Sequence, residues 1–161
     1  MHTIKITEGS KIKDETLYGI VPAVKATSAM TLFSKLIADS TNKNVKEPKL
    51  LGLLLARLIP KKYRRVALLA GWCMHYGIGL SWVWVFRFLA RKDKRGTIFT
   101  DTLFLSAFSG LTGILFWKLF FRLHPDPPGV KDPLFYRQLF LAHLVFGVVA
   151  IFSDKKPEGI T

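Results

Sequence analysis

The pattern of apolar and polar residues along the chain predicts four helices that cross a membrane. Apolar residues dominate four stretches, at residues 20–38, 66–89, 98–121 and 134–153. A helix needs about 20 mostly apolar residues to cross a bilayer. The second stretch is the strongest, since it runs from Val66 to Phe86 without a formal charge. The first is the weakest because Lys25 and Lys35 interrupt it, and it could instead lie on the membrane surface as an amphipathic helix.

A shorter apolar stretch, at residues 49–59, lies between the first two long ones. It is too short to cross a bilayer, and Pro48 and Pro60 flank it as helix start and stop signals. Its apolar middle and basic flanks are typical of an amphipathic helix in the membrane interface, but a helix that caps the bundle would have the same pattern. The sequence therefore predicts one all-α membrane domain over residues 1–161, a bundle of four transmembrane helices plus this short helix.

Composition and charge favour lipid over nucleic acid as the partner of the basic residues. The chain of 161 residues is 50% hydrophobic and has a net charge of +13. The basic residues flank the apolar stretches, so we expect them to bind anionic lipid headgroups rather than nucleic acid. Residues 1–18 are polar and contain no apolar core of a secretory signal, so we expect no cleaved leader. The single cysteine, Cys73, is expected to be a small packing residue.

The orientation in the membrane depends on a nearly even distribution of charge. If all four stretches cross, the basic residues divide almost equally between the two sides, so the positive-inside rule does not decide. The densest cluster between two strong helices is Arg91–Arg95, which favours a cytoplasmic location for that link and for both termini. Trp82, Trp84, Trp117 and Tyr136 lie toward the ends of the stretches, where interfacial aromatic residues are expected.

Two short similarities suggest that the chain contains two related helical hairpins. Residues 32–36 read Leu-Phe-Ser-Lys-Leu and residues 115–119 read Leu-Phe-Trp-Lys-Leu. A His-x-x-x-Gly pattern then occurs at His75 in the second long stretch and at His143 in the fourth. Matches in the same order in successive hairpins are typical of a parallel internal repeat, although chance matches are common in a chain rich in Leu and Phe.

Both histidines are predicted to lie near the middle of the membrane, at matched depth. Ala67, Gly71 and Gly79 share a helix face with His75, and Gly147 lies one turn from His143. Such small residues let helices approach closely. Further small residues, Ser106, Ser109, Gly110 and Gly113, form a similar seam on the third long stretch.

Three roles are open for the histidine pair. Each ring could hydrogen-bond across helices and stabilise the bundle; His75 and His143 could ligate a b-type haem; or they could form a proton or quinone path with Tyr76. Lys35 and Lys118 are expected either to extend to the headgroups or to bind a lipid phosphate together.

The sequence contains no motif that would identify an enzyme. Metal-ligand spacings, a nucleophile elbow, a phosphate-binding loop and paired carboxylates are all missing from it. The leading prediction is a non-enzymatic accessory or scaffold subunit of a larger membrane assembly, or a protein that self-associates. The alternatives are a haem- or quinone-linked redox subunit that uses the two histidines, and a small transporter or channel.

Five segments carry a resemblance to a family of proteins. They are residues 29–34, Glu47-Pro48 with the following leucines, and residues 75–79, 124–128 and 141–147. In these segments the chain resembles a family of small bacterial polytopic membrane proteins to which no chemistry is assigned. The resemblance implies a bacterial cytoplasmic-membrane setting, and it implies no substrate, cofactor or catalytic residue.

Overall fold

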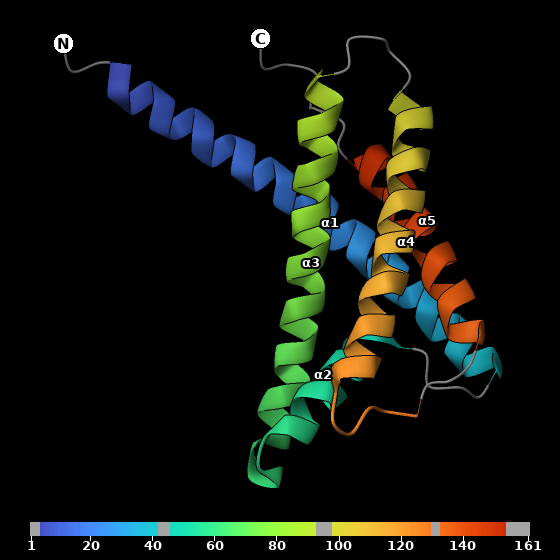
Figure 1. The fold of residues 1–161 in the computed structure, drawn as a ribbon. Coiled ribbons are helices and arrows are strands. Elements are labelled where there is room, and N and C mark those ends of the chain that lie inside the picture. Colours follow the sequence, from blue (N-terminus) through green and yellow to red (C-terminus); the bar gives the residue numbers. More distant parts are fainter. Residues whose placement is uncertain (1–3, 42–45, 93–97, 130–132, 154–161) are drawn as a thin grey trace.

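The protein is an all-helical bundle, as the sequence predicts. The computed structural model describes residues 4–41, 46–92, 98–129 and 133–153. Its elements, in chain order, are α1 (Ile4–Thr41), α2 (Glu47–Leu58), the short 3-10 helix η1 (Lys61–Tyr63), α3 (Arg64–Lys92), α4 (Ile98–Leu123) and α5 (Pro133–Ser153) (Figure 1). The described ranges contain no strand.

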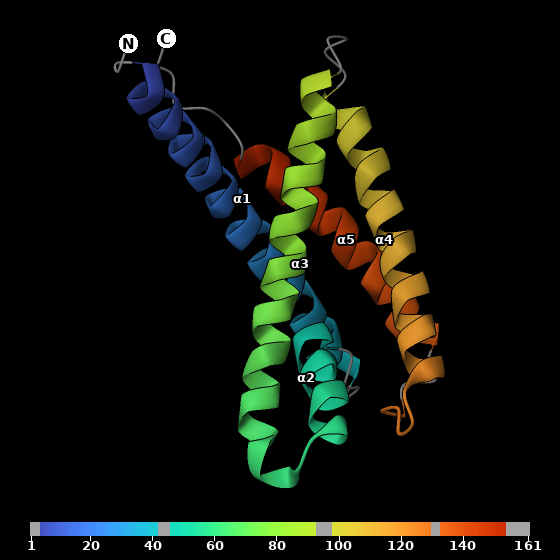
Figure 2. The same cartoon turned by 60° about the vertical axis from the view of Figure 1, so that its left-hand side comes forward.

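Four of the described helices are long and apolar enough to cross a membrane, which confirms the predicted spans. These spans are Gly19–Thr41, Lys61–Leu89, Thr102–Leu123 and Pro133–Ser153. The start of α1, the end of α3, the start of α4 and the end of α5 lie at one end of the bundle, and α2 lies at the other (Figures 1 and 2). The chain is therefore a multi-pass membrane protein.

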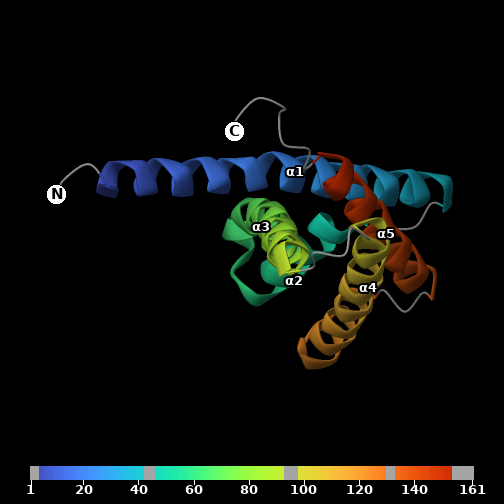
Figure 3. The same ribbon diagram turned by 90° about the horizontal axis from the view of Figure 1, so that it is seen from above.

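The first helix is much longer than the apolar pattern indicates. It begins at Ile4, whereas the pattern placed its start near residue 20. Viewed from above, its first part projects well beyond the other helices (Figure 3). The pattern marks only where a helix is apolar, and polar residues such as Lys and Glu have a good helix propensity, so this extension had no apolar signal.

The helices pack in an order that differs from their order in the chain. The most extensive contacts join α2 with α3, α1 with α5, and α4 with α5, and α1 also packs against α3. By contrast, α3 and α4 meet over only a short stretch, although they are neighbours in sequence. The first and last helices, α1 and α5, thus connect the α2–α3 pair with α4 (Figure 2). The internal duplication stays a prediction.

The small residues noted in the sequence bring these helices together. A Cβ atom at Gly71 of α3 would collide with the backbone of Gly52 in α2, so the two helices cross at glycines. In the same way Gly79 of α3 contacts α1, and Gly147 of α5 contacts α4. These small residues pack inside the chain, so they are not free to bind a partner subunit.

The short helix α2 packs on the bundle along the first turns of α3. Its contacts run from Pro48 against Gly71 to Gly52 against Leu68, which makes the two helices antiparallel. Half of α2 is buried, including Glu47 and Leu50. Of the two predicted roles, this arrangement favours a helix that caps the bundle.

Candidate ligand-binding cavity

A cavity of about 240 Å³ lies among the helices of the bundle, and each of α1 to α5 contributes to its wall. Apolar side chains form most of this wall. Its polar side chains are Thr27, Glu47, His75, Thr112 and His143. Both predicted intramembrane histidines therefore face one cavity. The concave shape, the mainly apolar wall and a few polar groups are the usual features of a small-molecule site.

His75 is fixed by a hydrogen bond between α3 and α1. The Thr31 hydroxyl donates its only proton to the Thr27 carbonyl oxygen, at 2.7 Å. The contact of 2.9 Å between Thr31 Oγ1 and His75 Nε2 therefore requires His75 Nε2–H to be the donor. In the neutral ring, Nδ1 is then left as an acceptor.

His143 has the opposite tautomer. Its Nδ1 lies 2.8 Å from the Leu139 carbonyl oxygen of the preceding turn, and a carbonyl can only accept, so Nδ1–H donates. In the neutral ring Nε2 is an acceptor, and the structure gives it no partner among the described residues. The ring packs against Gly113 of α4, where a Cβ would lie 3.2 Å from Nε2. The glycine thus makes room for the imidazole at the cavity wall.

Glu47 is a buried carboxyl group at the start of α2. Its Oε1 accepts hydrogen bonds from the Ser34 hydroxyl at 2.8 Å and from Gln138 Nε2 at 2.6 Å. These three side chains connect α1, α2 and α5, and each is at most 2% exposed. Glu47 Oε2 and Gln138 Oε1 are buried without a hydrogen-bond partner in the described part of the chain, as is Thr27 Oγ1 at the cavity wall. Buried polar atoms without partners are rare in native proteins and call for an explanation.

Burial also changes the acidity of this carboxyl group. Desolvation raises the pKa of Glu47 from its ordinary value of 4.5 to about 7, and the hydrogen bonds from its own backbone, Ser34 and Gln138 offset only part of the effect. No cation among the described residues pairs with the group: the amine of the adjacent Lys46 pairs instead with Asp39, at 3.1 Å. Glu47 therefore exchanges its proton near neutral pH.

Aromatic rings form much of the remaining wall. Trp82, Phe116, Trp117 and Phe146 all line the cavity. Trp117 is buried and packs edge-on against Phe135, with ring centroids 5.4 Å apart. The Trp117 ring thus faces the bundle interior rather than its outer surface, and its depth in the membrane stays a prediction.

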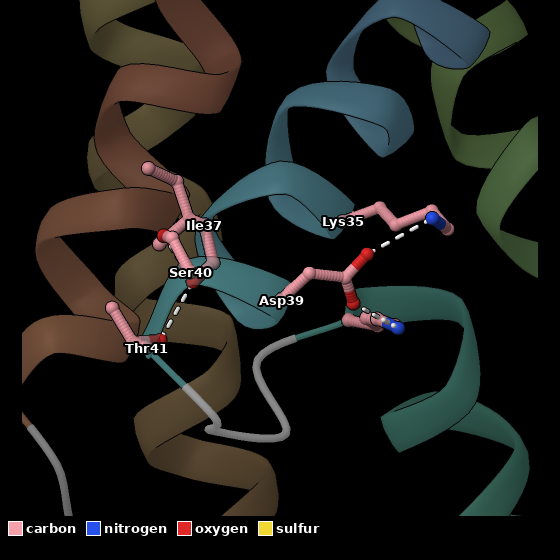
Figure 4. Close-up of polar contacts among 6 residues, drawn as sticks. Lys35, Ile37, Asp39, Ser40 and Thr41 are labelled. Carbon is pink, nitrogen blue, oxygen red and sulfur yellow. Dashed lines mark hydrogen bonds and ion pairs between the residues drawn. The ribbon is translucent and has the colours of Figure 1, made fainter.

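The two lysines predicted to bind lipid each contact another side chain. Lys35 of α1 pairs with Asp39 one turn later, at 2.9 Å, and the other oxygen of Asp39 accepts from Lys46 (Figure 4). Beside this pair Thr41 Oγ1 donates to the Ile37 carbonyl oxygen (Figure 4). Lys118 lies over the Tyr136 ring, 5.4 Å from its centroid. Both lysines are exposed, so a headgroup site at either one stays a prediction.

The link after α4 is tied to α2 by a histidine that carried no signal in the sequence. His124 Nε2–H donates to the Leu54 carbonyl oxygen at 3.0 Å, and Nδ1 accepts from the Asp126 backbone N–H. Arg57 at the end of α2 also pairs with Asp126, at 3.0 Å. Residues 124–129, the described part of the proline-rich link between α4 and α5, thus help to hold α2 in place. Residues 130–132, like residues 93–96 of the basic link between α3 and α4, lie outside the described residues.

Sequence reasoning found the histidines but missed the acid beside them. A charged residue before a proline is typical of a solvated helix start, so the local pattern does not indicate that Glu47 is buried. Gln138 was a usable signal, because a polar amide inside an apolar stretch needs a partner. Cys73 differs from the expectation as well: it is exposed on α3 rather than packed inside.

The cavity does not suit the redox cofactors considered for the histidine pair. A volume of about 240 Å³ falls below the range of roughly 300–1,000 Å³ usual for drug-sized ligands, and a porphyrin is larger than most of these. His75 Nε2, which would ligate the iron, is bonded to Thr31. Quinone oxygens need donors, whereas most free polar atoms here are acceptors. Across the described ranges, no three His, Cys, Asp or Glu side chains gather as a metal site would require.

The fold and the cavity define the class of protein: a multi-pass helical membrane protein with a mainly apolar cavity in its bundle, lined by a few polar groups. Comparison with known proteins adds no relative, since no family model matches the chain and no curated protein or solved structure is significantly similar to it.

Proposed function

We propose that this chain is a non-enzymatic membrane protein that binds a small, largely apolar molecule in its central cavity. The cavity itself carries the proposal, because five helices from distant parts of the sequence surround it. An apolar cavity of about 150 Å³ holds one benzene molecule. The volume of about 240 Å³ therefore suits an aromatic ring with a short substituent.

The side chains support binding rather than a continuous channel. A channel would need a polar line through the bundle, for which the sequence offers Thr27, Thr31, Ser106, Ser109, Thr112 and the two histidines. The hydroxyls of Ser106 and Ser109 are buried, and each donates to a carbonyl oxygen of its own helix, at 2.6 and 2.8 Å. These two serines therefore contribute no free hydroxyl to a pathway through the bundle.

The accessory-subunit role stays a proposal with less support than the sequence indicated. It depended on small-residue seams that could receive a partner helix and on a Phe-rich surface. The seams at Gly71, Gly79 and Gly147 are filled by helices of this chain, whereas Phe88, Phe104 and Phe152 are exposed on the bundle. Native mass spectrometry of a mild detergent extract tests it. A fixed ratio to other chains would support the role, and a bare monomer would contradict it.

We also propose a bacterial cytoplasmic membrane as its location, with both termini in the cytoplasm. The family resemblance supports the location, and the basic cluster at Arg91–Arg95 supports the orientation. The common end of the bundle at which α1 starts and α5 ends agrees with it (Figure 2). A C-terminal alkaline phosphatase fusion should be inactive, and an active fusion would overturn the orientation.

A cavity-blocking variant tests the proposed function. Ile78 lines the cavity and is 39% exposed, so Ile78→Trp should close it without disturbing the packed core. The matched control is Val85→Trp, on the same helix, 41% exposed and away from the cavity. Wild type and the control should bind benzyl alcohol in calorimetric titrations corrected for empty micelles, and Ile78→Trp should not. Equal binding by all three proteins would overturn the proposal.

A further inference from the structure

The free polar atoms at the cavity wall share one property, which is an excess of hydrogen-bond acceptors. The Glu47 carboxylate has Oε2 without a partner, and the tautomer fixed by the Leu139 carbonyl leaves His143 Nε2 as an acceptor. Thr27 Oγ1, also without a hydrogen-bond partner among the described residues, packs against Gly79 beside the cavity and can accept or donate. The site therefore complements a molecule that brings donors.

The charge at the wall has the sign that matches such a molecule. Glu47 is the acid of the cavity wall, and among the described residues neither lysine nor arginine lines the cavity. The cations next to Glu47 in the chain are engaged or turned away: Lys46 pairs with Asp39, and Lys49 is exposed. A buried carboxylate without a counter-charge is unfavourable in the membrane, and a cation beside it removes that cost.

Aromatic side chains complete the environment that a hydrophobic cation requires. The faces of Trp rings attract ammonium groups, and Trp82 and Trp117 both line the cavity. Phe116 and Phe146 add apolar wall for the body of a ligand. An ammonium with N–H donors on a small apolar body satisfies the carboxylate, the orphan acceptors and the rings together.

We infer that the ligand of this cavity is a small organic ammonium ion, a primary or secondary amine with an apolar body, whose charged nitrogen pairs with Glu47. This inference rests on the proposed function, since it names the ligand class of the same cavity. The volume of about 240 Å³ limits the ligand to about the size of benzylamine.

Proton and ligand compete for the same carboxyl group. Because burial raises the pKa of Glu47 to about 7, the group is largely protonated at pH 6 and largely ionised at pH 8. Amine binding should thus strengthen about tenfold between these values, since binding displaces one proton. His75 of α3 and His143 of α5 face the same cavity, whereas the described part of α4 contributes no charged group to it. On α1, Lys35 and Asp39 pair with each other outside the cavity.

The experiment is a calorimetric titration of the detergent-solubilised full chain with three probes of similar shape: benzylamine, benzyl alcohol and benzoate. At pH 8 we expect benzylamine to bind roughly tenfold more tightly than benzyl alcohol, as one charged hydrogen bond would give, and benzoate not to bind. Glu47→Gln should reduce the preference for the amine to about twofold or less and abolish its pH dependence. This variant keeps both histidines, so it assigns the pH response to the carboxyl group.

Two further variants keep the test valid if Glu47→Gln fails to fold. Thr27→Val removes an orphan hydroxyl that no described protein group uses, and it should weaken amine binding severalfold. Asp126→Asn, which neutralises a carboxylate whose side chain is 72% exposed on the α4–α5 link, should leave amine binding unchanged.

The outcomes separate the inference from the proposed function. If benzyl alcohol binds as tightly as benzylamine and Ile78→Trp blocks both, the cavity binds ligands but the ammonium assignment is wrong. If no probe binds in a manner that Ile78→Trp blocks, the proposed function itself fails.

Discussion

Replacing Glu47 by glutamine should stabilise the protein, and more so as the pH rises. In the folded state the carboxyl group is desolvated, and its pKa is about 7 instead of 4.5. A group whose pKa is raised on folding stabilises the fold fully below the unfolded value, and this contribution is lost as the pH rises through the folded value. The relevant window therefore runs from about pH 4.5 to about pH 7.

The size of the effect follows from the same shift. One pKa unit corresponds to about 1.4 kcal/mol, so the contribution lost across the window is on the order of 3 kcal/mol. In the Glu47→Gln variant the new amide oxygen would accept the same hydrogen bonds from Ser34 and Gln138, and the amide never ionises. Relative to the wild type, the stability of the variant should therefore rise by up to about 3 kcal/mol between pH 4 and pH 8.

Thermal unfolding in detergent at several pH values measures this difference. For a chain of this length, about 3 kcal/mol corresponds to roughly 6–12 °C in Tm. Asp126→Asn is the matched control, because its side chain is 72% exposed, and its Tm difference from wild type should not vary between pH 5 and pH 8. A Glu47→Gln difference that is equally independent of pH would refute the reasoning, since it would mean that water reaches the carboxyl group.

Three other outcomes are expected. Gly71→Ala should destabilise the protein by about 1–3 kcal/mol or more, because the new Cβ would meet the Gly52 backbone. Gly77→Ala, in open space on the same helix, should be neutral or stabilising by up to about 1 kcal/mol. Thermal unfolding of the two variants distinguishes these effects. A double-mutant cycle on Arg57 and Asp126 should give a coupling below about 1 kcal/mol, since both side chains are substantially exposed, and a larger value would contradict this. Protein purified from haem-replete cells should show no Soret band, and a band lost on replacing either intramembrane histidine would contradict our interpretation.

The long helices could be predicted because their signal is local. Each spanning stretch is a run of apolar residues, and the bilayer requires about 20 of them in a row. The beginning of α1 at Ile4 was missed for the same reason, because that part of the helix carries no apolar run. The position of Trp117 in its stretch does not tell that the ring turns into the bundle, because which face of a helix turns inward depends on its neighbours.

The candidate site could be predicted only in part, because most of its contacts join distant residues. The two histidines were recognised as ionisable groups inside apolar stretches, and helix rise alone set them at matched depth. Glu47 becomes a cavity residue only because α2 packs antiparallel to α3 and carries it to Gln138, far along the chain. No local pattern at the start of α2 contains that information.

The polar groups of the cavity differ in whether a structural role accounts for them. His75 and His143 each make a hydrogen bond within the bundle, which a structural role explains. The carboxyl group of Glu47 does not fit that account, since one of its oxygens is buried without a partner and an amide oxygen would accept the same two hydrogen bonds without a buried charge. A residue that costs stability where a neutral one would serve is what a binding site requires, because activity and stability often oppose each other at such positions. If Glu47→Gln is both the more stable protein and the one that no longer prefers an ammonium ion, the carboxyl group serves the ligand and not the fold.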